Sequence, residues 1–376
     1  MMRENRNFKS PRLIVSGGGT GGHVFPAIAI ADAFKKKHHD AEILFVGAKG
    51  KMEMERVPAA GYPIEGLWIS GFKRELSLDN LSFPFKLVSS MLKARRILKS
   101  FRPDAVVGVG GFASGPVMKM AAMMGIPVII QEQNSFPGVT NKLVAPKASR
   151  ICVAYEGMEK WFPKEKIVLT GNPLRNMMNV VVEGKEKGAL LFGLDPKKPI
   201  ILLVGGSQGA LGINKGVSAQ LKMFADVDYQ MIWQTGKHYL EQAQKEVHDL
   251  QLDDRVKPLV FIDDMKLAYS CADIVISRAG AMSISELSQQ RKAVVFVPLP
   301  TAAEDHQTKN ALSLVQKDAA VMVKNDDAPM ELVPTVFDLL NDEEKLRRMQ
   351  NNIAKFARPN AADDIVKEID GVLGIL

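Results

Sequence analysis

The sequence predicts an α/β protein of two doubly wound, parallel-sheet domains that face one cleft. Apolar strand-like runs alternate with helical patterns along all 376 residues, and this length favours two domains. Both halves also open alike, with an apolar strand, a glycine-rich loop and then a helix. The two openings read LIVSGGGTGG at 13–22 and IILLVGGSQGALG at 200–212. This shared beginning indicates two domains of similar architecture.

The individual elements follow from β-branched runs and helical periodicity. In the first half we expect a helix over 26–37 and strands at 13–17, 42–47, 104–111 and 126–134. In the second half we expect strands at 199–206, 229–236, 256–262, 272–280 and 292–298. The joint is expected near GNPLR (171–175), so the first domain would cover 1–170 and the second would begin at 171.

Composition and charge narrow the classes of protein. A hydrophobic content of 46% excludes a mainly disordered chain, and the two cysteines, Cys152 and Cys271, lack metal-ligand spacing. We expect a soluble or peripheral protein, because no signal peptide or spanning segment is apparent. The first 170 residues carry 25 basic against 14 acidic side chains, whereas the remainder is net acidic. The first half of the chain is therefore expected to contact an acidic partner or substrate.

The glycine loops are the main candidates for ligand binding. Gly17, Gly19 and Gly22 match the dinucleotide pattern G-x-G-x-x-G. A dehydrogenase would need an acidic residue at the end of the next strand, but Gly47 and Ala48 stand there, and no Walker lysine is present. Similar loops follow two more expected strands, at 110–115 and 205–209. Such loops, at the carboxyl ends of strands, favour an anion such as a diphosphate.

Two side chains stand out beside these loops. Ser207 lies within the third loop, where its hydroxyl and the following amides could hold a diphosphate. His23 directly follows the first loop, at the start of the expected helix. A histidine titrates near neutral pH, so His23 is a candidate acid or base. A lone histidine is more often a surface or core residue than a catalyst, but beside a phosphate-type loop the two interpretations are nearly balanced.

A set of motifs, taken in order, resembles one family. They are GGGTGGHVFPAIAIADAF, VGGFASGP, QEQNSFPGVTNK, GNPLR, GGSQGALGIN, FIDDM, SRAGAMSISE and DHQTKNA, and they extend from about residue 12 to 320. This series is similar to that of the MurG family of bacterial N-acetylglucosaminyltransferases. The resemblance implies a GT-B fold of two Rossmann-like domains, 1–170 and 171–350, with a C-terminal helix in 351–376 that returns to the first domain.

The resemblance also implies an activity and a donor site. The reaction would be the inverting transfer of GlcNAc from UDP-GlcNAc to the C4 hydroxyl of lipid I, undecaprenyl-pyrophosphoryl-MurNAc-pentapeptide, to give lipid II. It would occur at the cytoplasmic face of the bacterial inner membrane. The implied donor-binding residues are Thr20, Gly21, Gly22, Asn134, Arg175, Ser207, Ile262, Ala281, Met282, Ser283, Ile284, Ser285, Glu286 and Gln307.

The mechanism requires a base and a way to hold the departing UDP. Asp226 and Asp228 match a metal-binding Asp-x-Asp pattern, but they precede an expected strand and so lie at the wrong end of the sheet. We therefore expect no catalytic metal and no cofactor; helix N-termini, loop amides and Arg175 would hold the diphosphate. His23 is the first candidate for the base and Glu132 the second.

The segment 83–102 is a candidate for contact with a membrane. It reads FPFKLVSSMLKARRILKSFR and holds six basic and no acidic residues from 86 to 102. Leu87, Met91, Ala94, Leu98 and Phe101 recur at helical spacing and are expected to pack on the sheet. The basic face and the preceding LSFPF are expected to meet anionic lipids, and no motif supports binding to nucleic acid.

Two alternatives remain from the sequence. A GT-B transferase could move a UDP-sugar to a different lipid or to a small acceptor. A nucleotide-sugar binder without catalytic activity would keep the second-half site and lose the loops of the first half, but those loops are intact here.

Overall fold

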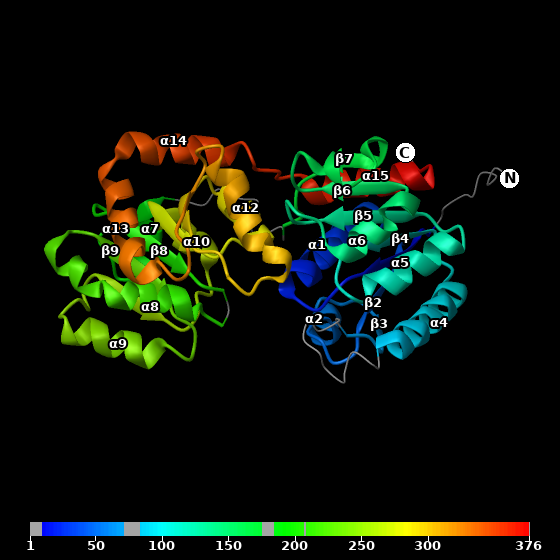
Figure 1. Cartoon of the computed structure of the whole chain (residues 1–376), viewed down its shortest axis with the longest axis horizontal. Helices are drawn as coiled ribbons and strands as arrows, with labels where there is room; N and C mark the ends of the chain where they lie inside the picture. Colours follow the sequence, from blue (N-terminus) through cyan, green and yellow to red (C-terminus); the bar gives the residue numbers. More distant parts are fainter. Residues whose placement is uncertain (1–9, 71–82, 175–183, 207, 376) are drawn as a thin grey trace. The chain divides into compact units, whose positions relative to one another are not determined.

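A computed structural model describes residues 10–70, 83–174, 184–206 and 208–375. The chain divides into two compact units, the first formed by Met1–Asn176 with Arg358–Leu376 and the second by Met177–Ala357. Figure 1 shows that each unit is a sheet flanked by helices. Each unit is described by itself below.

The first unit contains a seven-stranded parallel sheet in the order β3-β2-β1-β4-β5-β6-β7. Its strands are β1 (Arg12–Ser16), β2 (Glu42–Ala48), β3 (Ile64–Leu67), β4 (Ala105–Gly108), β5 (Val128–Glu132), β6 (Arg150–Val153) and β7 (Ile167–Leu169). Its helices are α1 (Gly21–Lys37), α2 (Glu53–Ala59), α4 (Phe83–Phe101), α5 (Ser114–Met123), α6 (Val139–Val144) and α15 (Ala361–Leu373).

Helices cover both faces of this sheet, because the side chains of each strand alternate between the faces. On β1, Leu13 and Val15 pack with α1 and α15, whereas Ile14 packs on the opposite face with α4 and α5. The helix α15 belongs to the first unit although the chain passes through the second unit before reaching it (Figure 1). Its buried residues Ile365 and Ile369 share a core with α1.

The second unit contains a six-stranded parallel sheet in the order β10-β9-β8-β11-β12-β13. Its strands are β8 (Ile200–Val204), β9 (Gln230–Gln234), β10 (Val256–Leu259), β11 (Ile274–Ser277), β12 (Ala293–Phe296) and β13 (Val321–Met322). Its helices are α7 (Lys185–Leu191), α8 (Leu211–Ala219), α9 (Leu240–Asp249), α10 (Met265–Cys271), α11 (Ala281–Gln289), α12 (His306–Val315), α13 (Ala328–Asn341) and α14 (Glu343–Ala354).

The expected strands are all present, but four short ones were missed. These are β3, β6, β7 and β13, of which β13 has only two residues. The expected helix 26–37 begins earlier, at Gly21, so it includes the second half of the first glycine loop. As expected, α4 packs on the sheet through Ala94 and Leu98, with Leu87, Met91 and Phe101 against the same core.

Candidate functional site

The strand order of each sheet reverses at one point, which defines where ligands bind in doubly wound folds. In the first sheet β1 lies between β2 and β4, and in the second β8 lies between β9 and β11. The glycine loops that follow β1 and β4, and those that follow β8 and β11, are therefore at the two reversal points. All three loops predicted from sequence fall at these positions.

In the first unit, the loops after β1 and β4 are in close contact. A Cβ atom built on Gly111 would lie 2.3 Å from the carbonyl oxygen of Gly18, and Gly111 has a φ of +84°. A Cβ on Gly17 would lie 2.1 Å from Cγ2 of Val109. These glycines are thus required by the contact between two loops, whereas the sequence suggested that they serve the approach of a ligand.

The first glycine loop also binds a carboxylate from within the chain. Glu53, at the first position of α2, accepts hydrogen bonds from the backbone amides of Gly19 and Ala48, both at 2.9 Å. Its side chain is only 1% exposed. Sequence reasoning missed Glu53, because it lies on a different helix from the glycine loop.

His23 lies on the first turn of α1, and its ring is anchored on one side. Nδ1 lies 3.2 Å from the carbonyl oxygen of Gly18 and 3.2 Å from Oγ1 of Thr20. A carbonyl oxygen can only accept a hydrogen bond, so the contact with Gly18 favours the neutral tautomer with the proton on Nδ1 and the lone pair on Nε2. The Nε2 edge borders Gly110 in the loop after β4: a Cβ there would lie 3.0 Å from Nε2. The ring of His23 is therefore held with Nδ1 toward Gly18 and Thr20 and with its Nε2 edge toward Gly110.

Glu132, at the end of β5, is buried and accepts several hydrogen bonds. Its oxygens accept from the amides of Asn134 at 3.0 Å and Gly138 at 3.1 Å, and from Nδ2 of Asn141 at 2.8 Å. Burial raises the pKa of this carboxyl, although the hydrogen bonds lower it in part. Because most of its accepting capacity is directed at one loop, Glu132 organises the turn between β5 and α6.

Buried amides connect this loop to the end of the first unit. Nε2 of Gln131 donates to Oδ1 of Asn172 at 3.0 Å, and Nδ2 of Asn172 donates to the carbonyl of Gln133 at 3.1 Å. Nε2 of Gln133 in turn donates to the carbonyl of Val109 at 2.9 Å, in the loop after β4. The segment that leads to Arg175 is thus anchored to the same group of loops.

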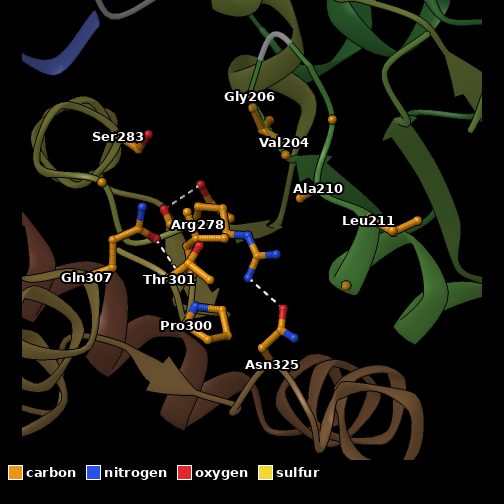
Figure 2. A pocket seen from close by; sticks show the side chains of 16 residues that line it. Val204, Gly206, Ala210, Leu211, Arg278, Ser283, Pro300, Thr301, Gln307 and Asn325 are labelled. Atoms are coloured by element: carbon orange, nitrogen blue, oxygen red, sulfur yellow. Dashed lines mark hydrogen bonds between the residues drawn. The ribbon is translucent and has the colours of Figure 1, made fainter. Parts of the chain in front are cut away.

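The second unit contains a cavity of about 540 Å³ at its own reversal point, which is large enough for a nucleotide-sized ligand. Figure 2 shows it between the loop after β8, the start of α11 and the segment after β12. Its lining includes Gly205, Gly206, Gly280, Ser283 and Gln307. Backbone amides at a loop and a helix start make this an anion-binding environment.

Arg278 brings a positive charge into this cavity. Its Nη1 donates to the carbonyls of Val297 at 2.9 Å and Pro298 at 3.0 Å, and to Oδ1 of Asn325 at 3.0 Å. Burial lowers the pKa of Arg278, but a guanidinium stays charged at neutral pH. In Figure 2 the rest of the guanidinium points toward Ala210 and Leu211 at the start of α8. The sequence had placed Arg278 inside the expected strand 272–280, whereas the structure ends β11 (Ile274–Ser277) one residue before it.

Gln307 presents its amide group at the opposite wall of the cavity. Its Oε1 accepts from the backbone amide of Leu299 at 2.9 Å, which fixes the orientation of the side-chain amide. Figure 2 shows the amide nitrogen of Gln307 directed toward Ser283. Because Oε1 of Gln307 already accepts a hydrogen bond, its side-chain nitrogen is the group that faces the cavity as a donor.

Glu286 lies on α11 and accepts a hydrogen bond from a tyrosine on the preceding helix. Oη of Tyr269, on α10, donates to Oε2 of Glu286 at 3.4 Å. Tyr269 is 2% exposed, and burial, followed by the charge of Glu286, raises its pKa well above the ordinary value. Ile262, which is also 2% exposed, lies a few residues before α10. The hydrogen bond from Tyr269 thus connects α10 to Glu286 on α11.

Comparisons with known proteins agree with this geometry. The family model for the glycosyltransferase family 28 N-terminal domain matches residues 13–153, and the model for its C-terminal domain matches residues 200–365. A relative from Parabacteroides distasonis, the UDP-N-acetylglucosamine--N-acetylmuramyl-(pentapeptide) pyrophosphoryl-undecaprenol N-acetylglucosamine transferase, is 54% identical over 95% of this chain and 97% of its own length. The chain belongs to the MurG family.

Further matches support the same family and the fold. The enzyme of the same name from Phocaeicola vulgatus is 53% identical over 95% of both chains. The crystal structure of Acinetobacter baumannii MurG matches with a TM-score of 0.78 and 31% identity, covering 96% of this chain and 99% of that one. The expected GT-B fold of two Rossmann-like units is confirmed.

The residues expected from the MurG family fall into two groups, one in each unit. Thr20 is the N-cap of α1, Gly21 and Gly22 are its first residues, and Asn134 lies in the loop organised by Glu132. Ala281, Met282, Ser283, Ile284, Ser285 and Glu286 form the first part of α11, after the N-cap residue Gly280. Arg175 and Ser207 lie outside the described residues.

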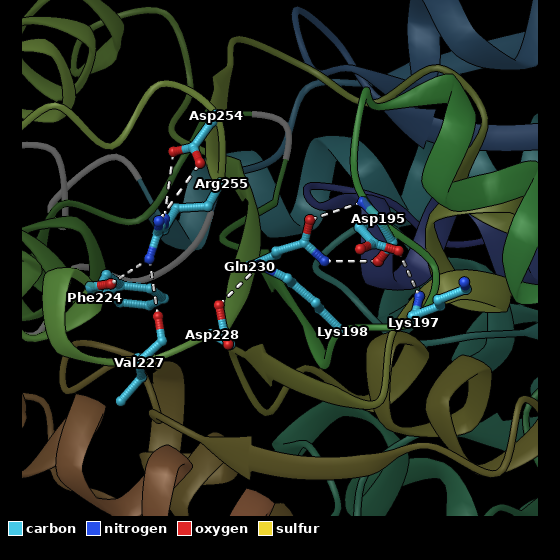
Figure 3. A network of polar contacts seen from close by, with 9 residues as sticks. All are labelled: Asp195, Lys197, Lys198, Phe224, Val227, Asp228, Gln230, Asp254 and Arg255. Carbon is cyan, nitrogen blue, oxygen red and sulfur yellow. Dashed lines mark hydrogen bonds and ion pairs between the residues drawn. The ribbon is translucent and has the colours of Figure 1, made fainter.

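The Asp-x-Asp pair lies at the other end of the second sheet, as predicted. Asp228 lies just before β9 and forms an ion pair with Lys198 at 2.8 Å. Figure 3 shows the surrounding network, in which Arg255 donates to the carbonyl of Val227 and Gln230 bonds with the backbone of Asp195. These contacts join loops at the amino ends of strands, so they are structural.

Proposed function

We propose that this chain transfers GlcNAc from UDP-GlcNAc to the C4 hydroxyl of the MurNAc sugar in lipid I, giving lipid II with inversion. The observation that carries this proposal is the 54% identity, over nearly the full length, to an enzyme named for this transfer. The chain is an N-acetylglucosamine transferase, and its product belongs to peptidoglycan synthesis.

The donor is proposed to occupy the cavity of the second unit. Glu286 would accept hydrogen bonds from the ribose hydroxyls, and the backbone at Ile262 would contact the uracil edge. The amides at the start of α11, together with Ser283 and Ser207, would hold the diphosphate. The amide of Gln307 would donate to a sugar hydroxyl.

Charge on the departing UDP must be neutralised as the glycosidic bond breaks. We propose that Arg278 shares this task with Arg175 and with the N-terminus of α11. Arg278 is suited to it because its Nη1 bonds hold the guanidinium rigidly at the cavity wall. The proposal includes no catalytic metal and no cofactor.

His23 is the proposed general base. Nε2 would take the proton from the C4 hydroxyl while the hydroxyl oxygen attacks the anomeric carbon and UDP leaves with the bonding electron pair. Thr20, Gly21 and Gly22 would contribute amides at the start of α1, and Asn134 would contact the donor sugar. We assign Glu132 a positioning role, because its oxygens accept from the loop that carries Asn134.

The helix α4 is proposed to meet an anionic membrane surface. Phe85, Val88 and Leu92 are 73%, 59% and 61% exposed, and Arg95 and Lys99 are exposed on the same helix. Exposed apolar and basic side chains on one helix favour binding at the interface of anionic lipids. Within the described residues, no helix combines the length and the apolar character needed to cross a bilayer. We place the enzyme at the cytoplasmic face of the inner membrane, where lipid I would be its partner.

The test is transfer of labelled GlcNAc from UDP-GlcNAc to a lipid I analogue in the presence of EDTA. We expect activity in the wild-type enzyme, a collapse of kcat in His23→Ala, and a raised KM for UDP-GlcNAc in Glu286→Ala. His39→Ala is the matched control, because His39 is an exposed histidine beyond the other end of α1.

Each alternative outcome has a distinct meaning. Binding of UDP-GlcNAc without any transfer to lipid I would contradict the acceptor assignment and favour a transferase with a different acceptor. Full activity of His23→Ala would refute the base assignment alone. Loss of activity in EDTA, restored by a divalent cation, would refute the metal-free mechanism.

Membrane binding has a separate test by co-sedimentation with lipid vesicles. We expect binding to phosphatidylglycerol vesicles and weaker binding to phosphatidylcholine vesicles, with a loss in Val88→Ser/Leu92→Ser. Met330→Ser is a suitable control, since Met330 is 70% exposed on α13 in the second unit. Equal binding by both variants would remove α4 from the proposed surface.

A further inference from the structure

The carboxylate of Glu53 binds backbone amides at the ends of the first two strands. Its Oε2 accepts from the amide of Gly19 and its Oε1 from the amide of Ala48, each at 2.9 Å. Gly19 follows β1, and Ala48 is the last residue of β2, so one carboxylate bridges the ends of two adjacent strands. Charge-assisted hydrogen bonds of this kind are stronger than neutral ones.

The backbone on both sides of Glu53 is shaped to admit this side chain. A Cβ on Gly18 would lie 2.1 Å from Oε1, and a Cβ on Gly47 would lie 2.5 Å from Cγ of the glutamate. Two glycines, one in the loop after β1 and one near the end of β2, are therefore needed for the carboxylate to fit. The absence of an acidic residue at position 47, which argued against a dehydrogenase, has a structural reason in this contact.

The same loop holds the ring of His23. The carbonyl of Gly18 is the acceptor for Nδ1–H, while the amide of the next residue, Gly19, is bound by Glu53. A shift of the Gly18–Gly19 peptide would therefore move the acceptor away from Nδ1. Without that acceptor, the neutral imidazole could place its proton on Nε2 and lose its basic lone pair there.

We propose that Glu53 is a positioning residue for His23, which keeps the proton of the neutral ring on Nδ1 by fixing the Gly18–Gly19 peptide. This inference rests on the proposed role of His23 as the base. It also implies that the Gly19 amide is already bound by Glu53, so that a substrate anion would bind the amides at the start of α1 instead.

The test compares Glu53→Gln with Glu55→Gln, which changes an exposed glutamate on the same helix. In Glu53→Gln, the introduced side-chain amide can accept from one backbone N–H but opposes the other with its own N–H groups. We expect kcat to fall about 10- to 100-fold in Glu53→Gln, as a misplaced catalytic group predicts, with KM for UDP-GlcNAc within about 3-fold. Glu55→Gln is expected to match the wild type.

The ring nitrogens of His23 provide a readout that needs no substrate. In ¹⁵N-histidine NMR spectra we expect the Nδ1–H tautomer to dominate in the wild type and in Glu55→Gln, and the Nε2–H tautomer to increase in Glu53→Gln. The same variant is expected to change the acidic limb of the pH profile of kcat/KM. Glu53→Asp, which keeps the charge but is shorter by one methylene, replaces Glu53→Gln should the latter fail to fold.

The outcomes separate this inference from the proposed function. An unchanged tautomer together with reduced kcat would overturn the positioning role, because the loss would not act through His23. An unchanged kcat and tautomer would overturn it as well. A changed tautomer with full activity, alongside full activity of His23→Ala, would uphold the positioning of the ring and refute the assignment of His23 as the base.

Discussion

Replacing Gly111 by alanine tests whether the contact between the loops after β1 and β4 is essential. Gly111 has a φ of +84°, which costs an alanine about 1–2 kcal/mol. The new Cβ would also lie 2.3 Å from the carbonyl oxygen of Gly18, so the backbone of one loop must move. Strain of this kind adds about 1–3 kcal/mol. We therefore expect a total loss of about 2–5 kcal/mol in the free energy of unfolding.

Gly125→Ala separates the two contributions. Gly125 has a φ of +72°, but nothing lies within 4 Å of its Cβ position, so its replacement carries the conformational cost alone. For a unit of this size, each kcal/mol lowers the melting temperature by about 2–4 °C. We expect Gly111→Ala to melt several degrees below Gly125→Ala in differential scanning calorimetry, and to lose kcat because Gly18 also holds His23. Equal melting temperatures for the two variants would refute the reasoning.

Three further predictions concern buried polar groups. The buried hydroxyl of Tyr155 has no hydrogen-bond partner among the described residues, and burial raises its pKa. Folding stability should therefore fall as the pH rises above about 10, where the unfolded tyrosine ionises. Tyr155→Phe should flatten this fall by up to about 1.4 kcal/mol per pH unit in urea titrations, with no loss of stability at about pH 8. Asp370 is fully buried on α15, accepts from His38 at 2.8 Å and forms an ion pair with Lys37 at 2.6 Å. Asp370→Ala should lower the unfolding free energy by about 1–3 kcal/mol. An unchanged value in chemical denaturation would show that these two contacts do not hold α15 on α1. Tyr269→Phe removes one hydrogen-bond donor from Glu286, so it should weaken UDP binding about 3- to 10-fold in calorimetry and weaken binding of 2′-deoxy-UDP less. Equal weakening of both ligands would contradict the link of Tyr269 to ribose recognition.

Much of the architecture could be predicted because it depends on neighbours along the chain. The alternation of β-branched runs with helical periodicity identified the main strands, and glycines after a strand identified the three loops. The missed strands β6 and β7 are short and follow no glycine loop, so their sequence contrast is weak. β13, with only Val321 and Met322, exists because it pairs with β12. Pairing of this kind leaves little trace in local composition.

The candidate site likewise contains residues that the sequence could identify and contacts that it could not. His23 was singled out because it follows a glycine loop, and Gln307 because it lies in DHQTKNA, a motif of the resemblance to the MurG family. Glu53 could not be assigned to Gly19, because 34 residues separate them and their contact depends on β1 and β2 being neighbours. The bond from Tyr269 to Glu286 likewise requires α10 and α11 to lie side by side.

The sequence by itself determined the fold class, the order of the elements and the positions of the glycine loops, since propensity and periodicity act over a few residues. Only the tertiary structure decided what those glycines contact, which atom of His23 carries the proton, and that Arg278 stands at the wall of a cavity. Each of these depends on hydrogen bonds between strand ends that the sheet order brings together. A buried donor or acceptor takes the partner that the fold places within about 3 Å, and that partner is set by topology.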